Sequence, residues 1–155
     1  MSEATAGRSL AKGLLAGLVA GLVATAAKSC VEKFYPPRVH GEPEPPEALA
    51  EKIAGHELDR DTKVMAGQAI HWGFGAAAGA AYGALAEYFP VATDKEGATF
   101  GLTLITLTHE TSLPAMDLAE PTEDQSFRER SSEATSHLVY GLVAERVRRF
   151  VRKLL

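Results

Sequence analysis

The segment that decides the fold is LAKGLLAGLVAGLVATAA, residues 10–27. Its single charge lies on Lys12 near the beginning, where a long amine-bearing side chain can reach a membrane surface. As a helix the segment would be about 27 Å long, close to the hydrocarbon thickness of a bilayer. We therefore interpret it as a membrane-spanning helix. A secretory signal peptide is the alternative, because Arg8 and Lys12 precede the apolar run and ATAA follows it, but the run is long for a signal.

The composition of the whole chain also favours helices that pack in lipid. A length of 155 residues suffices for one domain with a core and is short for two. The hydrophobic share of 46% is ordinary, but it is made largely of alanine, next to 14 glycines and few aromatic residues. Such small side chains bury little area in a water-soluble core, whereas membrane helices use them to approach one another closely. We predict an all-α fold, a four-helix transmembrane bundle.

The periodicity and the prolines divide this single helical membrane domain, residues 1–155, into elements. Long helices are predicted over residues 9–31, 62–89, 95–114 and 127–154, and a short amphipathic helix over residues 46–54. Five of the eight prolines lie in FYPPRVHGEPEPP, residues 34–46, which predicts an extramembrane loop between the first two long helices. Pro114 is expected to end or bend the third long helix.

The charges exclude some functions and predict an orientation. A net charge of −4 argues against a nucleic-acid partner, which requires a basic surface. The basic end ERVRRFVRK, residues 145–153, predicts that both termini are cytoplasmic, and residues 115–127, without Lys or Arg, lie on the opposite side. Cys30 is the single cysteine, so an intrachain disulfide is excluded. Because no Walker A, dinucleotide, GxSxG or HExxH pattern occurs, an enzyme is not favoured and no cofactor is predicted.

Two rows of glycines recur at intervals of four residues on the first two long helices. They comprise Gly13, Gly17 and Gly21, and Gly75, Gly79 and Gly83. Residues four apart share a helix face, so each row forms a shallow groove against which another helix backbone can pack. The partner of each row is either a helix of the same chain or a second copy in a homo-oligomer. The lipid bilayer is the other predicted partner.

Ionisable residues on three of the predicted helices form a second constellation. The predicted intramembrane polar cluster comprises His71, His109, Glu110, Glu133 and His137. On the last helix, Glu133 and His137 begin a row at every fourth residue that continues with Gly141 and Glu145. Ionisable groups in a bilayer almost always face the bundle interior and pair with one another, so we expect these groups to meet inside.

Three kinds of role fit this cluster. Histidine beside carboxylates titrates near neutral pH, which predicts proton sensing or relay. His109, Glu133 and His137 are also a possible set of zinc or iron ligands, although the Glu-x-x-His pattern of di-iron bundles is absent. The third role is hydrogen bonding between helices. The alternative to a membrane protein is a soluble or peripheral helical bundle that binds a metal through the same residues.

Several short motifs carry a resemblance to a known family. They are a glycine-rich apolar first helix, YPPR with Pro36, Pro37 and Arg38, HW at residues 71–72, AEYFP at residues 86–90, His109, and SEATSHLVYG at residues 132–141. In this order they are similar to those of the YagU-like family of small bacterial inner-membrane proteins, a family of unknown function. The likeness extends from about residue 10 to residue 149.

The resemblance implies a four-helix protein of the bacterial inner membrane, without established enzymatic chemistry and with a link to acid tolerance. The residues that match the family pattern are Glu32, Arg38, Trp72, Glu87, Pro90, His109, Glu133, His137 and Glu145. His71 departs from it, because the family has an amide at that position. This departure counts against a metal site of three histidines.

Overall fold

The computed structural model describes residues 7–38 and 44–155. Residues 1–6, and residues 39–43 of the predicted proline-rich loop, lie outside that description. The elements are α1 (Leu10–Phe34), α2 (Pro45–Ala54), α3 (Arg60–Tyr88), the 3₁₀ segment η2 (Pro90–Gly97), α4 (Ala98–Leu107), the π-helical turn η3 (Thr108–Ser112), α5 (Leu113–Ala115) and α6 (Phe127–Leu154). No strand occurs among the described residues, so the prediction of an all-α fold is confirmed.

Local signals in the sequence fix where the helices begin and end. The capping side chains are Ser9 before α1, Asp59 before α3 and Ser126 before α6, and each accepts a hydrogen bond from the backbone N–H three residues further on. Gly55 ends α2 in the left-handed region, with φ of 75°. Lys95 and Glu96 also have positive φ, so α4 begins only at Ala98, three residues later than the predicted start.

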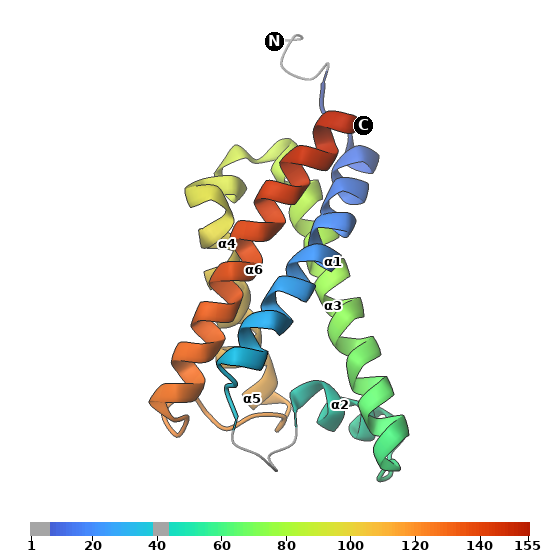
Figure 1. Cartoon of the computed structure of the whole chain (residues 1–155), viewed down its shortest axis with the longest axis vertical. Coiled ribbons are helices and arrows are strands. Elements are labelled where there is room, and N and C mark those ends of the chain that lie inside the picture. The colour runs from blue at the N-terminus through green and yellow to red at the C-terminus, as the bar shows by residue number, and fades with distance from the viewer. Residues whose placement is uncertain (1–6, 39–43) are drawn as a thin grey trace.

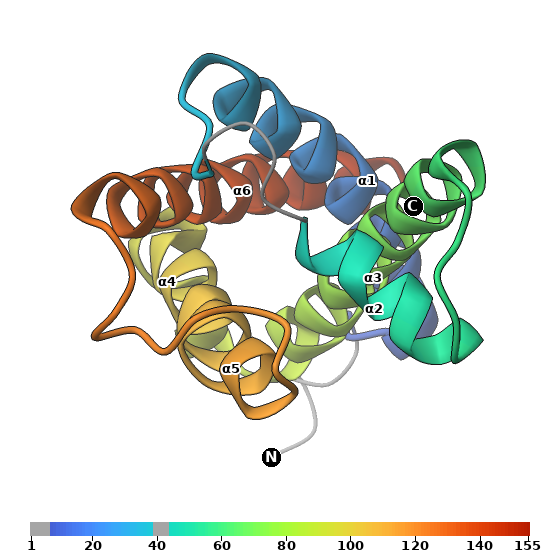
Figure 2. The same ribbon diagram turned by 90° about the horizontal axis from the view of Figure 1, so that it is seen from below.

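The long helices lie side by side along one axis (Figure 1). Helix α1 packs on both α3 and α6, α4 packs on α6, and α2 packs on α3. The beginning of α1 and the end of α6 lie together at one end of the bundle, and α2 and α5 lie at the other (Figure 1). Seen along the axis, α6, α1, α3, α5 and α4 surround a common centre (Figure 2). The last turns of α1 and the first turns of α3 and α6 lie at the same end of the bundle as α5 (Figure 1).

The two glycine rows pack against each other within one chain. A Cβ atom added to Gly17 would lie 2.8 Å from the Cα of Gly83, and one added to Gly79 would lie 2.7 Å from the backbone N of Gly21. Backbone atoms cannot move aside as a flexible side chain can, so only glycine permits this approach. The rows that were candidates for a homo-oligomer interface are therefore occupied by the α1–α3 contact.

A further glycine contact joins η2 and α4 to α6. A Cβ on Gly141 would lie 2.8 Å from the backbone N of Gly101, and Gly97 has a positive φ of 86° at the turn that begins α4. Beside this contact, the rings of Tyr82 and Phe100 stack with their centroids 4.2 Å apart. Glycine contacts thus hold α4 against α6 as closely as they hold α1 against α3.

The interior consists of small and polar side chains, and most of the large apolar ones face outward. Within the described residues, Ile105 and Leu118 are the only buried leucine, isoleucine or valine side chains. The buried polar residues are Thr25, Ser132, Glu133, Ser136, His137, Glu145 and Arg148. By contrast, the leucines of α1 at positions 10, 14, 15, 18 and 22 are 38–51% exposed. A soluble domain buries its leucines, so this packing is inverted.

By length and composition, α1 is the one helix of the described chain that is apolar enough to cross a membrane. A core helix of a soluble protein and a signal sequence would meet the same criterion. The other long helices of the described residues do not meet it.

Candidate functional site

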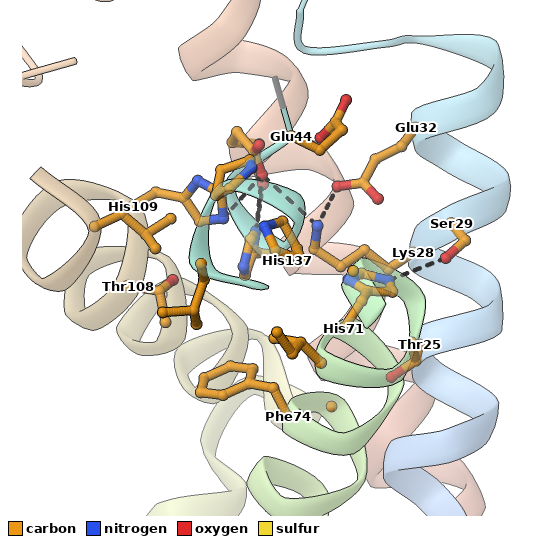
Figure 3. Close-up of a pocket in the computed structure, with 18 of the residues that line it drawn as sticks. Thr25, Lys28, Ser29, Glu32, Glu44, His71, Phe74, Thr108, His109 and His137 are labelled. Carbon is orange, nitrogen blue, oxygen red and sulfur yellow. Dashed lines mark hydrogen bonds and ion pairs between the residues drawn. The ribbon is translucent and has the colours of Figure 1, made fainter. Parts of the chain in front are cut away.

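A cavity of about 460 Å³ lies at the end of the bundle where α2 packs. It is enclosed by the last turns of α1 and by the first half of α3 and of α6. Its walls come from α1, α2, α3, the segment from α4 through η3 to α5, and α6 (Figure 3). Phe74, Leu104 and Leu113 give it an apolar part. The polar part collects side chains from α1, α2, α3, η3 and α6, including four of the five residues of the predicted cluster.

His109 reaches the cavity from a widened helical turn. The residues Thr108–Ser112 form a π-helix between α4 and α5, and such turns are frequent at functional sites. The hydroxyls of Thr111 and Ser112 donate to the carbonyls five residues earlier, at 2.8 and 2.6 Å. Pro114 has no N–H and cannot continue the α-helical bonding pattern, which explains a wide turn just before it. The expected bend near Pro114 therefore takes the form of a π turn that carries His109.

Glu133 and His137 come from successive turns of α6 and are both buried. The Nδ1–H of His137 donates to the backbone carbonyl of Glu133 at 2.9 Å, so Nε2 is the ring nitrogen with a free lone pair. The rings of His109 and His137 meet edge to face, with centroids 5.0 Å apart. His109 Nε2 lies 3.4 Å from Glu133 Oε2. Two helices thus bring the three side chains together.

The carboxylate oxygen Oε2 of Glu133 is the centre of this group. It lies 3.4 Å from His109 Nε2, 3.6 Å from His137 Nδ1 and 3.7 Å from Lys28 Nζ. It is buried and has no hydrogen-bond partner within the described part of the chain. A buried carboxylate oxygen without a partner costs free energy, so this atom marks a place where a ligand would be stabilised.

Of the five residues predicted for the polar cluster, the structure brings three into contact. They are His109, Glu133 and His137. His71 lines the same cavity, but its Nε2 pairs with the hydroxyl of Ser29 at 3.2 Å (Figure 3). Glu110 is exposed and does not line this cavity, but it lines a smaller pocket of about 220 Å³ with His109 and Glu133.

Lys28 and Glu32 belong to the site and were not identified in the sequence as a pair. They lie four residues apart on α1, form an ion pair, and both line the cavity. Their spacing is the signal that could have revealed them, since residues four apart share a helix face. They were missed because the apolar run ends at residue 27, just before this pair.

The predicted YPPR motif closes one side of the cavity. Pro37 is buried, and the Tyr35 hydroxyl lies 2.6 Å from the Ser131 hydroxyl on α6. Arg38 lines the cavity and pairs with Glu129 at 3.3 Å and with Glu44 at 3.4 Å. The motif therefore ties the end of α1 to the beginning of α6.

A family model described as "Protein of unknown function (DUF1440)" matches residues 22–146. This range covers most of the chain and contains every residue that lines the cavity, so the chain belongs to the DUF1440 family. A search of curated proteins and a search of solved structures each gave no match.

Proposed function

We propose that this member of the DUF1440 family is a small multi-pass protein of the bacterial inner membrane whose helices enclose a ligand-binding cavity. In this proposal α1, α3, the α4–α5 segment and α6 cross the bilayer. The observation that carries it is the inverted packing, with glycine, alanine and polar groups inside and leucine outside. Burial of one leucine stabilises a soluble protein by about 1.5–3 kcal/mol, and this chain leaves most of its leucines exposed. Hydrocarbon is the solvent in which such a surface is stable.

Helix α1 distinguishes this proposal from a soluble bundle. Only 33% of its most apolar 18-residue stretch is buried, whereas a core helix of a soluble protein would be mostly buried. Its buried face also supplies half of the glycine contact with α3. Cleavage as a signal peptide would remove that face and expose the backbone of Gly75, Gly79 and Gly83. Retention as a spanning helix therefore fits the packing better.

The proposed orientation places both termini in the cytoplasm. The beginning of α1 and the end of α6 share one end of the bundle (Figure 1), and the basic residues of the last turns of α6 lie there. Cytoplasmic segments of membrane proteins are enriched in Lys and Arg. The cavity, at the other end, would then lie near the periplasmic face. The likeness to the YagU-like family supports the same location.

Topology mapping tests this orientation. In a Cys30→Ser background, we expect Glu123→Cys to react with a membrane-impermeant maleimide in spheroplasts, and Asp94→Cys to react only after lysis. Both positions are exposed, so burial in the protein does not explain a difference. The unmodified Cys30→Ser protein is the labelling control. Release of the protein by a carbonate wash would instead support the alternative, a soluble or peripheral metal-binding bundle.

The cavity supports ligand binding. It gathers His109, Glu133 and His137 from two segments of the chain on one wall. A carboxylate oxygen that lacks a partner is a feature of a ligand site. We therefore assign these three residues to ligand binding.

The likeness to the YagU-like family adds a proposed role in acid tolerance, and we place its pH-sensitive part at the α2 cover of the cavity. Glu51 of α2 accepts from Lys63 Nζ at 2.8 Å and from the Leu58 N–H at 3.0 Å. These two hydrogen bonds lower the pKa of Glu51 below its ordinary value, and the bond from Lys63 has the larger effect. On the periplasmic side, acid would protonate this carboxylate and release α2 from α3.

We expect the stabilisation that Glu51 provides to be fully present above its unfolded pKa and lost as pH falls through its lower folded pKa. The Leu58 amide resonance should follow this titration in an NMR experiment, with a midpoint below 4.5. In Glu51→Gln the pH-dependent shift should disappear. Glu57→Gln, an exposed change in the same connection, is the control and should leave it unchanged. A midpoint at or above 4.5 would remove α2 as the acid-sensitive element.

A further inference from the structure

We infer that His109, Glu133 and His137 form a site for one divalent transition-metal ion, with an open coordination position toward the cavity. The inference rests on the proposed ligand cavity and gives the chemical class of its ligand. Imidazole nitrogen and carboxylate oxygen are donors that Zn(II) and Fe(II) share. No other group of three such donors within the described residues meets in this way.

The spacing of the three side chains fits one ion. Each offers a ligand atom, and these atoms all lie within 4.8 Å of one another. In a tetrahedral zinc site with bonds of about 2.0–2.1 Å, neighbouring ligand atoms are about 3.4 Å apart. His109 Nε2 and Glu133 Oε2 already have this separation, 3.4 Å. The other separations are at most 4.8 Å, so the three side chains would move closer together when they bind an ion.

The surroundings hold His137 in the form that a metal requires. Metal-binding histidines usually donate their other ring N–H to a backbone carbonyl or a carboxylate, which fixes the tautomer and the ring. Here the Nδ1–H of His137 donates to the carbonyl of Glu133, one turn earlier on α6. The lone pair of Nε2 is therefore available without a change of tautomer.

The charges near the site are compatible with a cation. Lys28 Nζ lies 3.7 Å from Glu133 Oε2, but the same amine forms an ion pair with Glu32. Lys28 can therefore remain paired with Glu32 when a metal ion takes the place of its amine beside Glu133. Arg38, the other cation that lines the cavity, is already paired with Glu44 and Glu129. The Oε2 atom of Glu133, which has no hydrogen-bond partner in the described chain, would gain a metal bond.

Three protein ligands leave coordination positions free. Two histidines and one carboxylate bind catalytic zinc together with a water molecule in the fourth position, and they also form the facial triad of non-haem Fe(II) sites. The cavity gives an exogenous ligand access to the free position, since all three side chains line it. Zn(II) and Fe(II) share this donor set, but they differ in coordination geometry, which spectroscopy can distinguish.

Metal titration of the full-length protein, purified in detergent after treatment with a chelator, tests the site. We expect one equivalent of Zn(II) or Fe(II) to bind, and Co(II) in place of zinc to give the strong visible absorption of a tetrahedral ion. Glu133→Gln and His109→Ala should each weaken binding by at least about 100-fold, because even changes around metal ligands cost about 10–100-fold. Six-coordinate absorption with two imidazoles in X-ray absorption spectra would favour iron instead.

The matched controls are Glu110→Gln and His56→Ala, which remove a neighbouring carboxylate and an exposed histidine. Both should retain wild-type affinity. Equal loss in the controls, or wild-type binding no tighter than in Glu133→Gln, would overturn the site. X-ray absorption on the metal-loaded wild-type protein gives the ligand set without any variant, in case a variant fails to fold. Membrane retention with no bound metal would remove this inference alone, whereas metal binding by a protein released by carbonate would remove the bilayer placement.

Discussion

Replacing Gly79 with isoleucine should prevent the bundle from assembling. A single Cβ at this position would already lie 2.7 Å from the backbone N of Gly21 in α1, closer than side chains are found to approach backbone. Overpacking in a tight core costs about 1–3 kcal/mol for small additions, and three further carbon atoms on a helix backbone contact cost more. Natural domains are stable by only about 5–15 kcal/mol, so we expect little folded Gly79→Ile protein by size-exclusion chromatography and thermal unfolding in detergent.

Gly73 provides the matched control on the same helix. Nothing lies within 4 Å of a Cβ added there, so Gly73→Ile makes the same chemical change in open space. This variant should be recovered in wild-type amounts, and it should unfold at nearly the wild-type temperature. Equal behaviour of the two variants would contradict the close contact between α1 and α3.

Replacing Glu145 with alanine should destabilise the protein by about 3–5 kcal/mol, because it leaves the buried guanidinium of Arg148 without its carboxylate partner. Glu145 is fully buried and accepts from the Tyr82 hydroxyl at 2.6 Å. It also accepts from Arg148 through two nitrogens, at 2.7 and 2.8 Å, and Arg148 is itself only 8% exposed. Denaturant titration of the detergent-solubilised protein measures the loss.

Two comparisons isolate the cause of that loss. Arg146→Ala removes an exposed ion pair with Glu96, whose side chains are 74% and 58% exposed, and should cost about 0–1 kcal/mol. The double replacement of Glu145 by leucine and Arg148 by methionine should cost less than Glu145→Ala, since no unpaired charge remains buried. A double variant that is less stable than the single one would show that the network stabilises through more than this charge pair.

The sequence predicts which segments are helical better than it predicts which faces meet. The apolar run that begins at residue 10 marks α1, because such a run is a local signal. Each glycine row marks a face that accepts a backbone, but spacing alone cannot say which backbone. The structure pairs the rows of α1 and α3 with each other, a choice that depends on chain connectivity and tertiary packing.

The site was predictable on α6 and less so elsewhere. Glu133, His137, Gly141 and Glu145 share one face by spacing, and the structure buries all four. The segment with His109 and Glu110 was harder to place, because the π turn departs from α-helical periodicity. The contact between Glu145 and Tyr82 was not predictable, since the two residues lie 63 positions apart in the chain.

The π turn at Thr108–Ser112 also lets Gly101 and His109 contact the same helix, α6, although an ordinary α-helix would point the two residues in different directions. Gly101 packs against the backbone of α6 near His137, and His109, eight residues later, meets Glu133 on the same helix. At about 100° per residue, an uninterrupted α-helix would rotate His109 about 80° away from the Gly101 face. The underwound turn reduces that angle. The length of the chain between Gly101 and His109 is therefore constrained as strongly as the identity of either residue.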